Sequence, residues 1–360
     1  MLACNTTTPP PSEASIYLII GSYSSADDEG IKVYTFDETN AEATYVSGLK
    51  GIENPSFVYP SADGTRVYAV GENDAPVVAT AHALAFDAEK GVLTLLNTQP
   101  TNGDAPCNII VSPDGKWVYT SNYNGGSITE FPLDAEGKLG EGRVIAFSGS
   151  SVDSVRQTQP HLHAVNFTPD GRFLLANDLG TDSIHMFDAA APIGGYHYCF
   201  ETPSGMGPRH LCFHPNGSMM YVLGELNGEV AAFNYLSKSE GMAKCKRHLA
   251  DSLHAEGSAD IHISPDGKFL YTSHRLKGDG ISIFRVPRWQ PDNLEKVGYQ
   301  PTGIHPRNFT ISPDGKWLLV ACRDDNVVQI YARDIETGLL TDTGKKIEMP
   351  KPVCLQWIER

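Results

Sequence analysis

The fold of this chain is indicated by residues 207–225, which read GPRHLCFHPNGSMMYVLGE. An alternating apolar run reaches a Pro-Asn-Gly turn at Gly217, and a β-rich run returns from that turn. The stretch therefore predicts a β-hairpin. Arg209 lies eight residues before Gly217, and Glu225 lies eight residues after it. Because the second strand runs antiparallel to the first, we expect Arg209 and Glu225 to lie close together at the open end of the hairpin.

The same pattern repeats along the chain and is marked each time by an Asp-Gly or Asn-Gly turn. The turns are Asp63-Gly64, Asp114-Gly115, Asp170-Gly171, Asn216-Gly217, Asp266-Gly267 and Asp314-Gly315. Their glycines are 46 to 56 residues apart. In most repeats a strand ending in proline precedes the turn, a second strand follows it, and a third and a weaker fourth strand come before the next repeat. Four strands in about 50 residues is the pattern of a β-propeller blade.

The two ends of the chain together predict a seventh blade. Residues 352–358 match the first strand of the repeat, but no turn follows them. Residues 17–23 and 30–36 supply the missing strands near the N-terminus. A ring closed by strands from both ends leaves no long free sheet edge. We therefore predict an all-β, seven-bladed β-propeller with four antiparallel strands per blade. It occupies residues 16–360 as a single domain behind a flexible tail of residues 1–15.

Composition and charge narrow the class of function. The chain carries 28 basic and 43 acidic side chains, a net charge of −15, which disfavours nucleic acids and anionic membranes as partners. No apolar run approaches the ~18 residues of a membrane-spanning helix. The seven cysteines are scattered without a Cys-x-x-Cys pair, and most lie in apolar strand patterns, so we interpret them as reduced core residues. We expect a monomer.

The first residues allow two interpretations of where the protein resides. Met1-Leu2-Ala3-Cys4, followed by a Thr- and Pro-rich stretch, is similar to a processed bacterial lipoprotein and its tether. The other interpretation is an ordinary flexible terminus, since the chain shows no hydrophobic signal there. We expect a cytoplasmic protein, with a periplasmic or surface lipoprotein anchored at Cys4 as the alternative.

Titratable residues gather at one mouth of the predicted channel. In each blade, the positions eight residues before and after the turn glycine lie at the same face, near the axis. In blades three to six these positions hold His163, Arg209, Glu225, Arg275, Arg307 and Arg323. Guanidinium groups suit carboxylates and phosphates, so the mouth is predicted to bind an anionic ligand, with the Ser-rich segment 147–160 as a loop over it. The alternative is that these are structural residues at strand ends that meet solvent.

The residues at the mouth support two kinds of chemistry. Glu225 among arginines should stay ionised, and His163 can move protons near neutral pH. Either could act as the general base in hydrolysis of an acidic ester or lactone, or in ring formation by an acid.

Four further side chains, His161, His210, Asp260 and His262, are candidates for substrate binding. His161 and His163 share one strand face, as do Asp260 and His262, an arrangement also found in metal sites. The spacing completes no zinc or calcium set, so we expect no metal and no cofactor. The alternative role for His210 and His262 is hydrogen bonding between blades.

Several motifs resemble those of one known family. They are Pro160-His161-Leu162-His163, Gly207-Pro208-Arg209-His210, Phe213-His214-Pro215-Asn216, Gly224-Glu225-Leu226-Asn227, Ala259–Gly267, Arg275, Gln300-Pro301 and Pro306-Arg307. From about Ile16 onward the chain resembles the bacterial seven-bladed propeller 6-phosphogluconolactonases, a family that also includes the fungal carboxy-cis,cis-muconate cyclases. The resemblance implies a metal-independent lactonase of the pentose phosphate route. It places the family's catalytic His, Arg, Glu and Arg at His163, Arg209, Glu225 and Arg275.

The resemblance also implies a small anionic sugar lactone as the substrate, 6-phosphoglucono-δ-lactone, opened by attack of water. Arg209 and Arg275 would then stabilise the developing oxyanion, and Arg307 or Arg323 would reach the phosphate. Two alternatives stay open. One is a muconate-type cycloisomerase, which needs no water, and the other is a propeller that binds a ligand or protein without catalysis.

Overall fold

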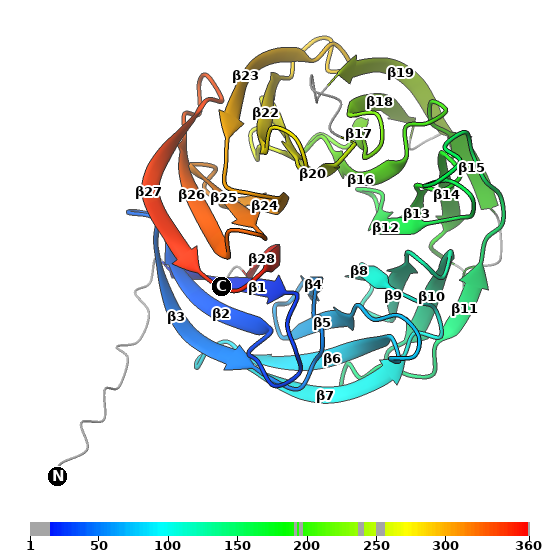
Figure 1. Ribbon diagram of the computed structural model, residues 1–360, viewed down its shortest axis with the longest axis vertical. Helices are drawn as coiled ribbons and strands as arrows, with labels where there is room; N and C mark the ends of the chain where they lie inside the picture. Colours follow the sequence, from blue (N-terminus) through cyan, green and yellow to red (C-terminus); the bar gives the residue numbers. More distant parts are fainter. Residues whose placement is uncertain (1–14, 191–192, 194–196, 237–240, 250–255, 359–360) are drawn as a thin grey trace.

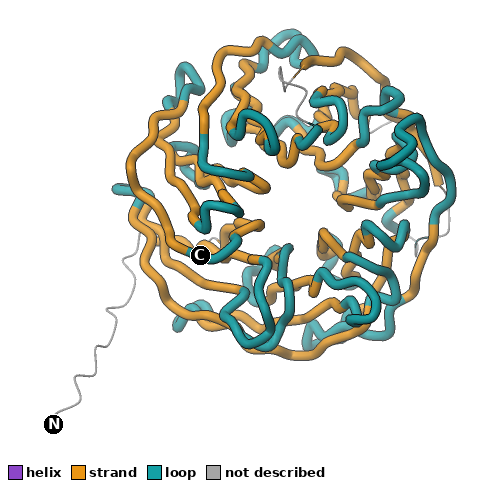
Figure 2. Tube along the Cα trace, viewed as in Figure 1, coloured by secondary structure: helices purple, strands orange, loops and turns teal. Residues whose placement is uncertain are grey.

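The computed structural model describes residues 15–190, 193, 197–236, 241–249 and 256–358, and folds them into a ring of sheets around a central axis (Figure 1). There are seven sheets, each with four antiparallel strands, so the predicted seven-bladed β-propeller is confirmed. Figure 2 shows that loops alone join the strands, with no helix in the described part of the chain. The possible tether at Cys4 lies outside the described residues, and the first strand begins at Ser15.

Three blades follow one another between Val58 and Glu201. From the channel outward they consist of β4 (Val58–Pro60), β5 (Arg66–Gly71), β6 (Thr80–Asp87) and β7 (Val92–Pro100); β8 (Pro106–Val111), β9 (Trp117–Asn122), β10 (Ser127–Pro132) and β11 (Arg143–Ala146); and β12 (Leu162–Phe167), β13 (Phe173–Asp178), β14 (Ser183–Asp188) and β15 (His197–Glu201).

The next three blades have the same order. They consist of β16 (Pro208–Phe213), β17 (Met219–Gly224), β18 (Glu229–Leu236) and β19 (Gly241–Leu249); β20 (Ser258–Ile263), β21 (Phe269–His274), β22 (Gly280–Arg285) and β23 (Glu295–Pro301); and β24 (Pro306–Ile311), β25 (Trp317–Cys322), β26 (Val327–Arg333) and β27 (Leu340–Glu348).

The two ends of the chain close the seventh blade, as predicted. Its order from the channel outward is β28 (Pro352–Ile358), β1 (Ser15–Ser22), β2 (Ile31–Asp37) and β3 (Glu42–Leu49). β28 runs antiparallel to β1, with Leu355 opposite Ile20. The strand nearest the axis therefore comes from one end of the chain and its three partners from the other.

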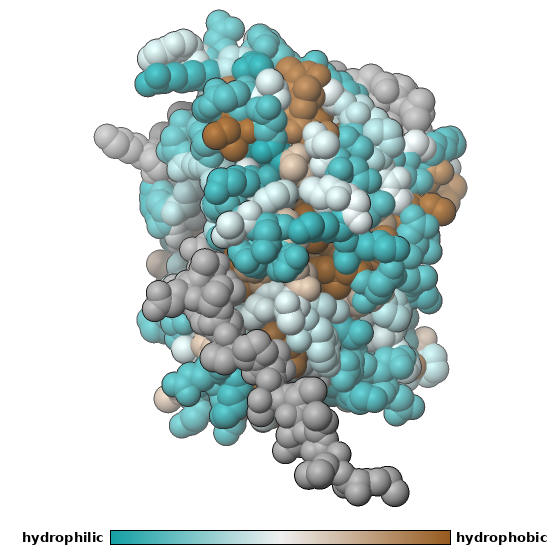
Figure 3. Space-filling view, turned by 90° about the vertical axis from the view of Figure 1, so that its left-hand side faces the viewer, coloured by the Kyte–Doolittle hydropathy of each residue, from teal (hydrophilic) through white to brown (hydrophobic). Residues whose placement is uncertain are grey.

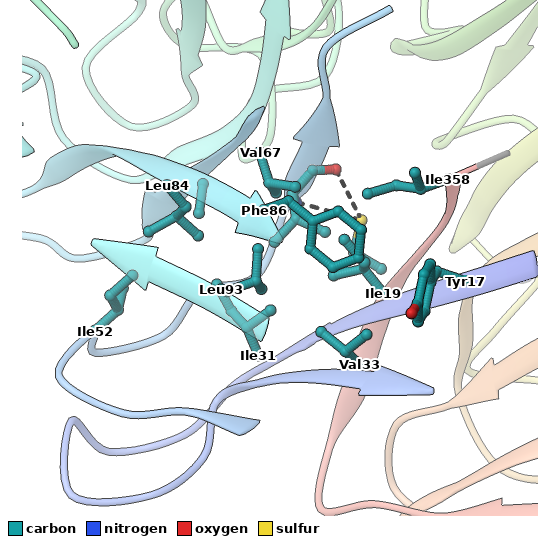
Figure 4. Close-up of a cluster of buried hydrophobic side chains, with 13 residues drawn as sticks. Tyr17, Ile19, Ile31, Val33, Ile52, Val67, Leu84, Phe86, Leu93 and Ile358 are labelled. Carbon is teal, nitrogen blue, oxygen red and sulfur yellow. Dashed lines mark hydrogen bonds between the residues drawn. The ribbon is translucent and has the colours of Figure 1, made fainter. Parts of the chain in front are cut away.

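Apolar side chains fill the spaces between neighbouring blades. In the described part of the chain there are seven such clusters, one for each pair of adjacent sheets. Figure 4 shows the cluster between the closing blade and the next, where Ile19 and Val33 pack near Val67 and Leu84. The buried thiol of Cys354 belongs to the same cluster. Blade-to-blade packing thus links the closing strand to the rest of the ring.

The second strand of each blade is buried on both faces because its sheet lies between two others. Every residue of β17 is buried, for example, whereas the outermost strand β7 has mostly exposed or half-buried residues. The turns that join the first two strands have the expected conformation. Their six glycines, among them Gly217, have φ between +66° and +74°, a region that residues with a Cβ rarely adopt.

The expectation that the cysteines lie in the core needs one correction. Cys107, Cys322 and Cys354 are buried and Cys212 is half-buried, but Cys199 is exposed. Cys199 lies on β15, the outermost strand of its blade, which has a neighbouring strand on one side only. An apolar pattern at that position does not lead to burial.

The side of the ring that Figure 3 shows is mainly polar. On the face shown in Figure 3, hydrophilic residues predominate and hydrophobic residues form small groups. Over the residues that the structure describes, no helix has the length and apolar character needed to cross a bilayer.

Candidate active site

The hairpin of β16 and β17 brings Arg209 and Glu225 together, as predicted. Arg209 Nε donates a hydrogen bond to Glu225 Oε2 over 2.9 Å. Arg275 follows the corresponding hairpin of the next blade and places its Nη2 3.4 Å from the same oxygen. All three side chains are buried. The open ends of two neighbouring hairpins therefore place two guanidinium groups next to one carboxylate.

The segment 147–160 contributes a third guanidinium group, which agrees with its expected place over the site. Arg156 is the only basic residue of this segment. Its Nη2 donates to Glu225 Oε1 over 2.7 Å and to Tyr123 Oη over 3.0 Å. Both oxygens of the Glu225 carboxylate are consequently engaged by arginines.

β-Bulges interrupt four of the inner strands near their starts, three of them at residues of the site. The pairing register of β8, β12, β16 and β24 is interrupted at Cys107, His163, Arg209 and Arg307. Successive residues of a regular strand point to opposite faces, but the extra residue of a bulge breaks that alternation. Arg209 and the next residue, His210, consequently meet, with Nη1 of the arginine 3.4 Å from Nε2 of the histidine.

The surroundings of Glu225 set the charges at the centre of the site. Burial alone would raise the pKa of Glu225, but its three arginine partners lower that pKa to about 2, so the side chain is an anion at neutral pH. Burial and the neighbouring Arg209 lower the pKa of Arg275 to about 9. An anionic ligand beside Arg275 would offset the charge of Arg209 and raise this pKa again.

Arg307 lies at the same mouth with a different set of partners. Its guanidinium group lies over the ring of Tyr23, 5.3 Å from the centroid, and its Nη2 lies 4.0 Å from Glu72 Oε1. Tyr23 donates a hydrogen bond to the Glu72 carboxylate over 2.9 Å, and Ser56 donates another. Burial lowers the pKa of Arg307, but Tyr23 and Glu72 raise it by more, so this arginine remains charged.

We define Arg156, Arg209, Arg275 and Arg307 as the arginine cluster. Their four guanidinium groups are paired with two carboxylates, Glu72 and Glu225. Among the described residues, these ion pairs leave the cluster with two more positive than negative charges. This local excess occurs in a chain whose net charge is −15.

His163 lies beside the arginine cluster and is buried. Its ring makes edge-on contacts with Tyr123 and His210, with centroids 5.5 and 5.2 Å away. Burial, followed by the charges of Arg209 and His210, lowers the pKa of His163 well below 6.5. The imidazole is therefore neutral at physiological pH and can accept a proton.

Asp260 joins two of the other predicted residues farther along the channel. Its Oδ1 lies 2.7 Å from His210 Nδ1, and its Oδ2 lies 2.9 Å from His262 Nε2. Burial opposes the ionisation of Asp260, but the two histidines lower its pKa, so it is a carboxylate. These three residues help to line a cavity of about 270 Å³ that is bounded by all seven inner strands. The Asp260 carboxylate thus orients the His210 ring that contacts His163.

Comparison with known proteins agrees with this architecture. The family model for lactonases with a seven-bladed β-propeller matches residues 17–357. The chain belongs to this lactonase family.

Relatives of this lactonase align with it over nearly their whole length. A 6-phosphogluconolactonase from Formosa agariphila is 35% identical, over 94% of this chain and 98% of its own. Among solved structures, a candidate 6-phosphogluconolactonase from Bacteroides fragilis is 46% identical, over 98% of this chain and 100% of its own, with a TM-score of 0.91. The periplasmic gluconolactonase of Pseudomonas aeruginosa is 28% identical, over 96% of this chain and 99% of its own, with a TM-score of 0.88.

Two of the predicted residues of this lactonase connect to the arginine cluster through other side chains. His161 stacks on Tyr123, with ring centroids 4.4 Å apart, and Tyr123 in turn accepts a hydrogen bond from the cluster. Arg323 pairs with Asp324 over 2.7 Å, and Asp324 lies 3.4 Å from His305, whose ring contacts a cluster arginine. Arg323 is thus turned toward its own neighbour in the chain.

Four residues of the site were not singled out from the sequence of this lactonase. Glu72 and Tyr123 occupy the position eight residues after the turn glycine in the first two blades, the same offset as Glu225. They were passed over because charged and titratable residues concentrate at these offsets in blades three to six. Tyr23 and Arg156 lie outside the repeat offsets. The signal that could have found Arg156 is its place as the one basic residue of a polar segment expected to cover the site.

Metal ligands were not predicted at this site. Among the residues with described side chains, no group of three or more His, Cys, Asp or Glu residues is arranged to hold a metal ion. The absence of a metal from the reaction stays a prediction.

Proposed function

We propose that this lactonase is a hydrolase that opens the ring of 6-phosphoglucono-δ-lactone by attack of water. Its family and its relatives, at 35% and 46% identity, support lactone opening. The observation that carries the choice of an anionic substrate is the excess of two positive charges in the arginine cluster. A phosphate monoester carries a charge of about −1.5 to −2 near neutral pH, which matches that excess.

Arg209 and Arg275 are the proposed stabilisers of the transition state. The carbonyl oxygen of the lactone becomes negative as water adds to the carbonyl carbon. Donors that are already in place stabilise this charge without reorganising. Glu225 holds both guanidinium groups, at 2.9 and 3.4 Å from one of its oxygens, so it would fix them before the substrate binds.

Arg307 is the proposed anchor of the phosphate group, with Arg323 as a secondary contact. Stacking on Tyr23 and pairing with Glu72 restrict the orientation of the Arg307 guanidinium group. A planar guanidinium group can donate two parallel hydrogen bonds to a phosphate. His161, His210, Asp260 and His262 would then shape the rest of the sugar-binding space.

His163 is the proposed general base. A base needs an available lone pair at the working pH, and the buried His163 imidazole is neutral. Glu225 is a weaker candidate because its pKa is about 2, and a carboxylate stabilised to that extent accepts a proton poorly. His163 would take a proton from the attacking water and return it to the ring oxygen as the carbon–oxygen bond breaks.

The substrate would make His163 a stronger base. The charges that lower the pKa of His163 include those of Arg209, Arg275 and Arg307. A bound phosphate would offset these charges and raise that pKa toward the operating pH, where general base catalysis is most effective. Substrate binding and activation of the base are coupled in this way.

We further propose that the protein is a monomer and uses no cofactor. We propose a cytoplasmic location because phosphorylated sugars are substrates of the cytoplasm. The alternative is a periplasmic or surface lipoprotein that carries a lipid on Cys4 and acts on a lactone without phosphate. The Pseudomonas aeruginosa relative is a periplasmic gluconolactonase, which keeps this alternative open. Metabolic lipid labelling of cells that carry the complete gene distinguishes the two, since label that is lost on Cys4→Ala would overturn the cytoplasmic assignment.

A panel of substrates tests the proposed reaction. Purified protein is assayed for opening of 6-phosphoglucono-δ-lactone and of glucono-δ-lactone, and for cyclisation of carboxy-cis,cis-muconate. We expect the phosphorylated lactone to be the best substrate and Arg209→Ala to lower its turnover by about 10²–10³. Cyclisation without lactone opening would favour the cycloisomerase, and inactivity on all three would favour a binding propeller. Either result would overturn the proposed function.

A further inference from the structure

Cys199 lies on the outermost strand of blade three and is exposed. Directly across the β14–β15 ladder, its partner in register is His185. Cross-strand partners lie on the same face of a sheet, close enough for their side chains to interact. The register thus brings the thiol of Cys199 beside the imidazole of His185.

Two further groups hold the His185 ring in place. Asp178, on the next strand inward, has its Oδ2 3.5 Å from His185 Nε2. The ring of Phe147 packs against the imidazole, with centroids 4.4 Å apart. Asp178 and His185 are buried, whereas Cys199 faces solvent. Three consecutive strands thus carry a carboxylate, an imidazole and a thiol in the order that nucleophilic cysteine sites use.

The charges of these groups favour an ionised thiol. Burial lowers the pKa of His185, but the neighbouring side chains of Asp178 and Cys199 raise it by more, to about 9, so the ring is protonated at neutral pH. The His185 imidazole beside it lowers the pKa of the Cys199 thiol in turn. A cation beside a partly exposed thiol is the environment that makes cysteines reactive.

We propose that Cys199 is a site of covalent modification, where a thiolate oriented by His185 and Asp178 reacts with hydroperoxides and small carbon electrophiles. With a hydroperoxide, the sulfur attacks the distal peroxide oxygen and the O–O bond breaks. The sulfur is oxidised to a sulfenic acid and the peroxide is reduced. The leaving oxygen takes the proton of His185 and departs as water or an alcohol.

Asp178 also contacts the candidate active site, and this determines which variants are informative. Its Oδ1 accepts hydrogen bonds from the backbone amides of His161 and Gly180, over 2.8 and 3.0 Å. A change at Asp178 would therefore disturb both places. Changes at Cys199 and His185 affect the thiol without touching the arginine cluster.

The rate of alkylation by iodoacetamide at pH 7 tests the proposal in the full-length protein, with peptide mapping to assign the modified cysteine. The matched control is Cys199→Ser combined with Thr44→Cys. This double variant has an exposed thiol on the outermost strand β3, opposite Thr35 instead of a histidine. An ordinary thiol is only a few per cent ionised at pH 7, so we expect Cys199 to react at least about fivefold faster than the control thiol.

The variant His185→Gln should slow the alkylation of Cys199 to about the control rate. Equal rates for Cys199 and the control thiol in otherwise native protein would overturn the proposal. If His185→Gln does not melt cooperatively, the comparison with the Thr44→Cys control decides the question.

Treatment with hydrogen peroxide followed by dimedone, which traps sulfenic acids, gives a second readout. We expect a dimedone adduct at Cys199 at peroxide concentrations that leave the control thiol unlabelled. No adduct at Cys199, or equal labelling of both thiols, would overturn the oxidative part of the proposal. Lactone opening by Cys199→Ser should equal that of the unchanged protein, which verifies its fold.

Discussion

The substitution Glu225→Gln tests most directly how the arginine cluster is held. It keeps the size of the side chain and removes the charge that lies 2.7, 2.9 and 3.4 Å from Arg156, Arg209 and Arg275. The pKa of Glu225 is about 2, against an ordinary value of 4.5. That difference corresponds to a contribution of about 3 kcal/mol to the free energy of unfolding. Removing one member of a buried ion pair typically costs ~3–5 kcal/mol, a range that includes the value obtained from the pKa difference.

The contribution of Glu225 should depend on pH in a defined direction. Because its pKa is lower in the folded chain, the stabilisation is fully present above pH ~4.5 and is lost as the pH falls toward ~2. For a chain of 360 residues, with an unfolding entropy of about 2.1 cal/mol/K per residue, a loss of 3 kcal/mol lowers the melting temperature by about 4 °C. We expect this difference between the unchanged protein and Glu225→Gln at pH 7, and we expect it to shrink in acid.

The difference in melting temperature is measured between pH 3 and 7 by thermal unfolding, monitored by circular dichroism. The pH dependence of kcat/KM distinguishes Glu225 from His163 as the general base. If Glu225 orients arginines, Glu225→Gln keeps the acid limb of the pH profile. The matched control is Glu130→Gln, which removes a buried carboxylate paired with Arg143 over 2.7 Å, far from the axis. It should lose stability and keep its turnover. An unchanged melting temperature for Glu225→Gln, or loss of its acid limb, would refute the assigned role.

Three further predictions concern the base, the phosphate and the ring. His163→Gln should lower kcat by ~10²–10⁴ and abolish the acid limb of kcat/KM. In the unchanged protein this limb should lie below pH 6.5, because burial and Arg209 lower the pKa of His163. Full activity in the variant would exclude His163 as the base. Arg307→Ala should raise KM for the phosphorylated lactone and leave KM for glucono-δ-lactone unchanged, and equal effects on both substrates would argue against phosphate binding. Deletion of Val353–Arg360 removes the strand that pairs with β1, so the cooperative melting transition should be lost; an unchanged transition would contradict closure by the two ends.

Much of the fold was predictable because it rests on local chemistry that repeats. A turn such as Asn216-Gly217 needs a residue that tolerates positive φ, and the strands on either side need alternating or continuous apolar runs. These signals recur about every 50 residues, which is enough to count the blades. The pairing of Arg209 with Glu225 was predictable for the same reason, since equal offsets from a tight turn are opposite each other on antiparallel strands.

The side chains that meet at the site depend on contacts between distant segments. The bulges at His163 and Arg209 break the alternation of their strands, and no repeat offset indicates which face such residues take. Arg156 reaches Glu225 across 69 positions of sequence from a segment that has no regular pattern. Arg323 has the expected offset, yet it pairs with the carboxylate of the next residue, Asp324, and not with the carboxylates of the arginine cluster.

The sequence thus specifies the blades, their number and the ends that close the ring, because turn geometry and hydrophobic periodicity act over a few residues. The orientation of charged side chains is different, since a guanidinium group takes the nearest carboxylate or carbonyl that the packed chain offers. The exposure of Cys199 shows the same distinction. The apolar pattern around Cys199 depends only on neighbouring residues in the sequence. Burial depends on whether another strand lies on each side, and β15 is the last strand of its blade, so Cys199 is exposed.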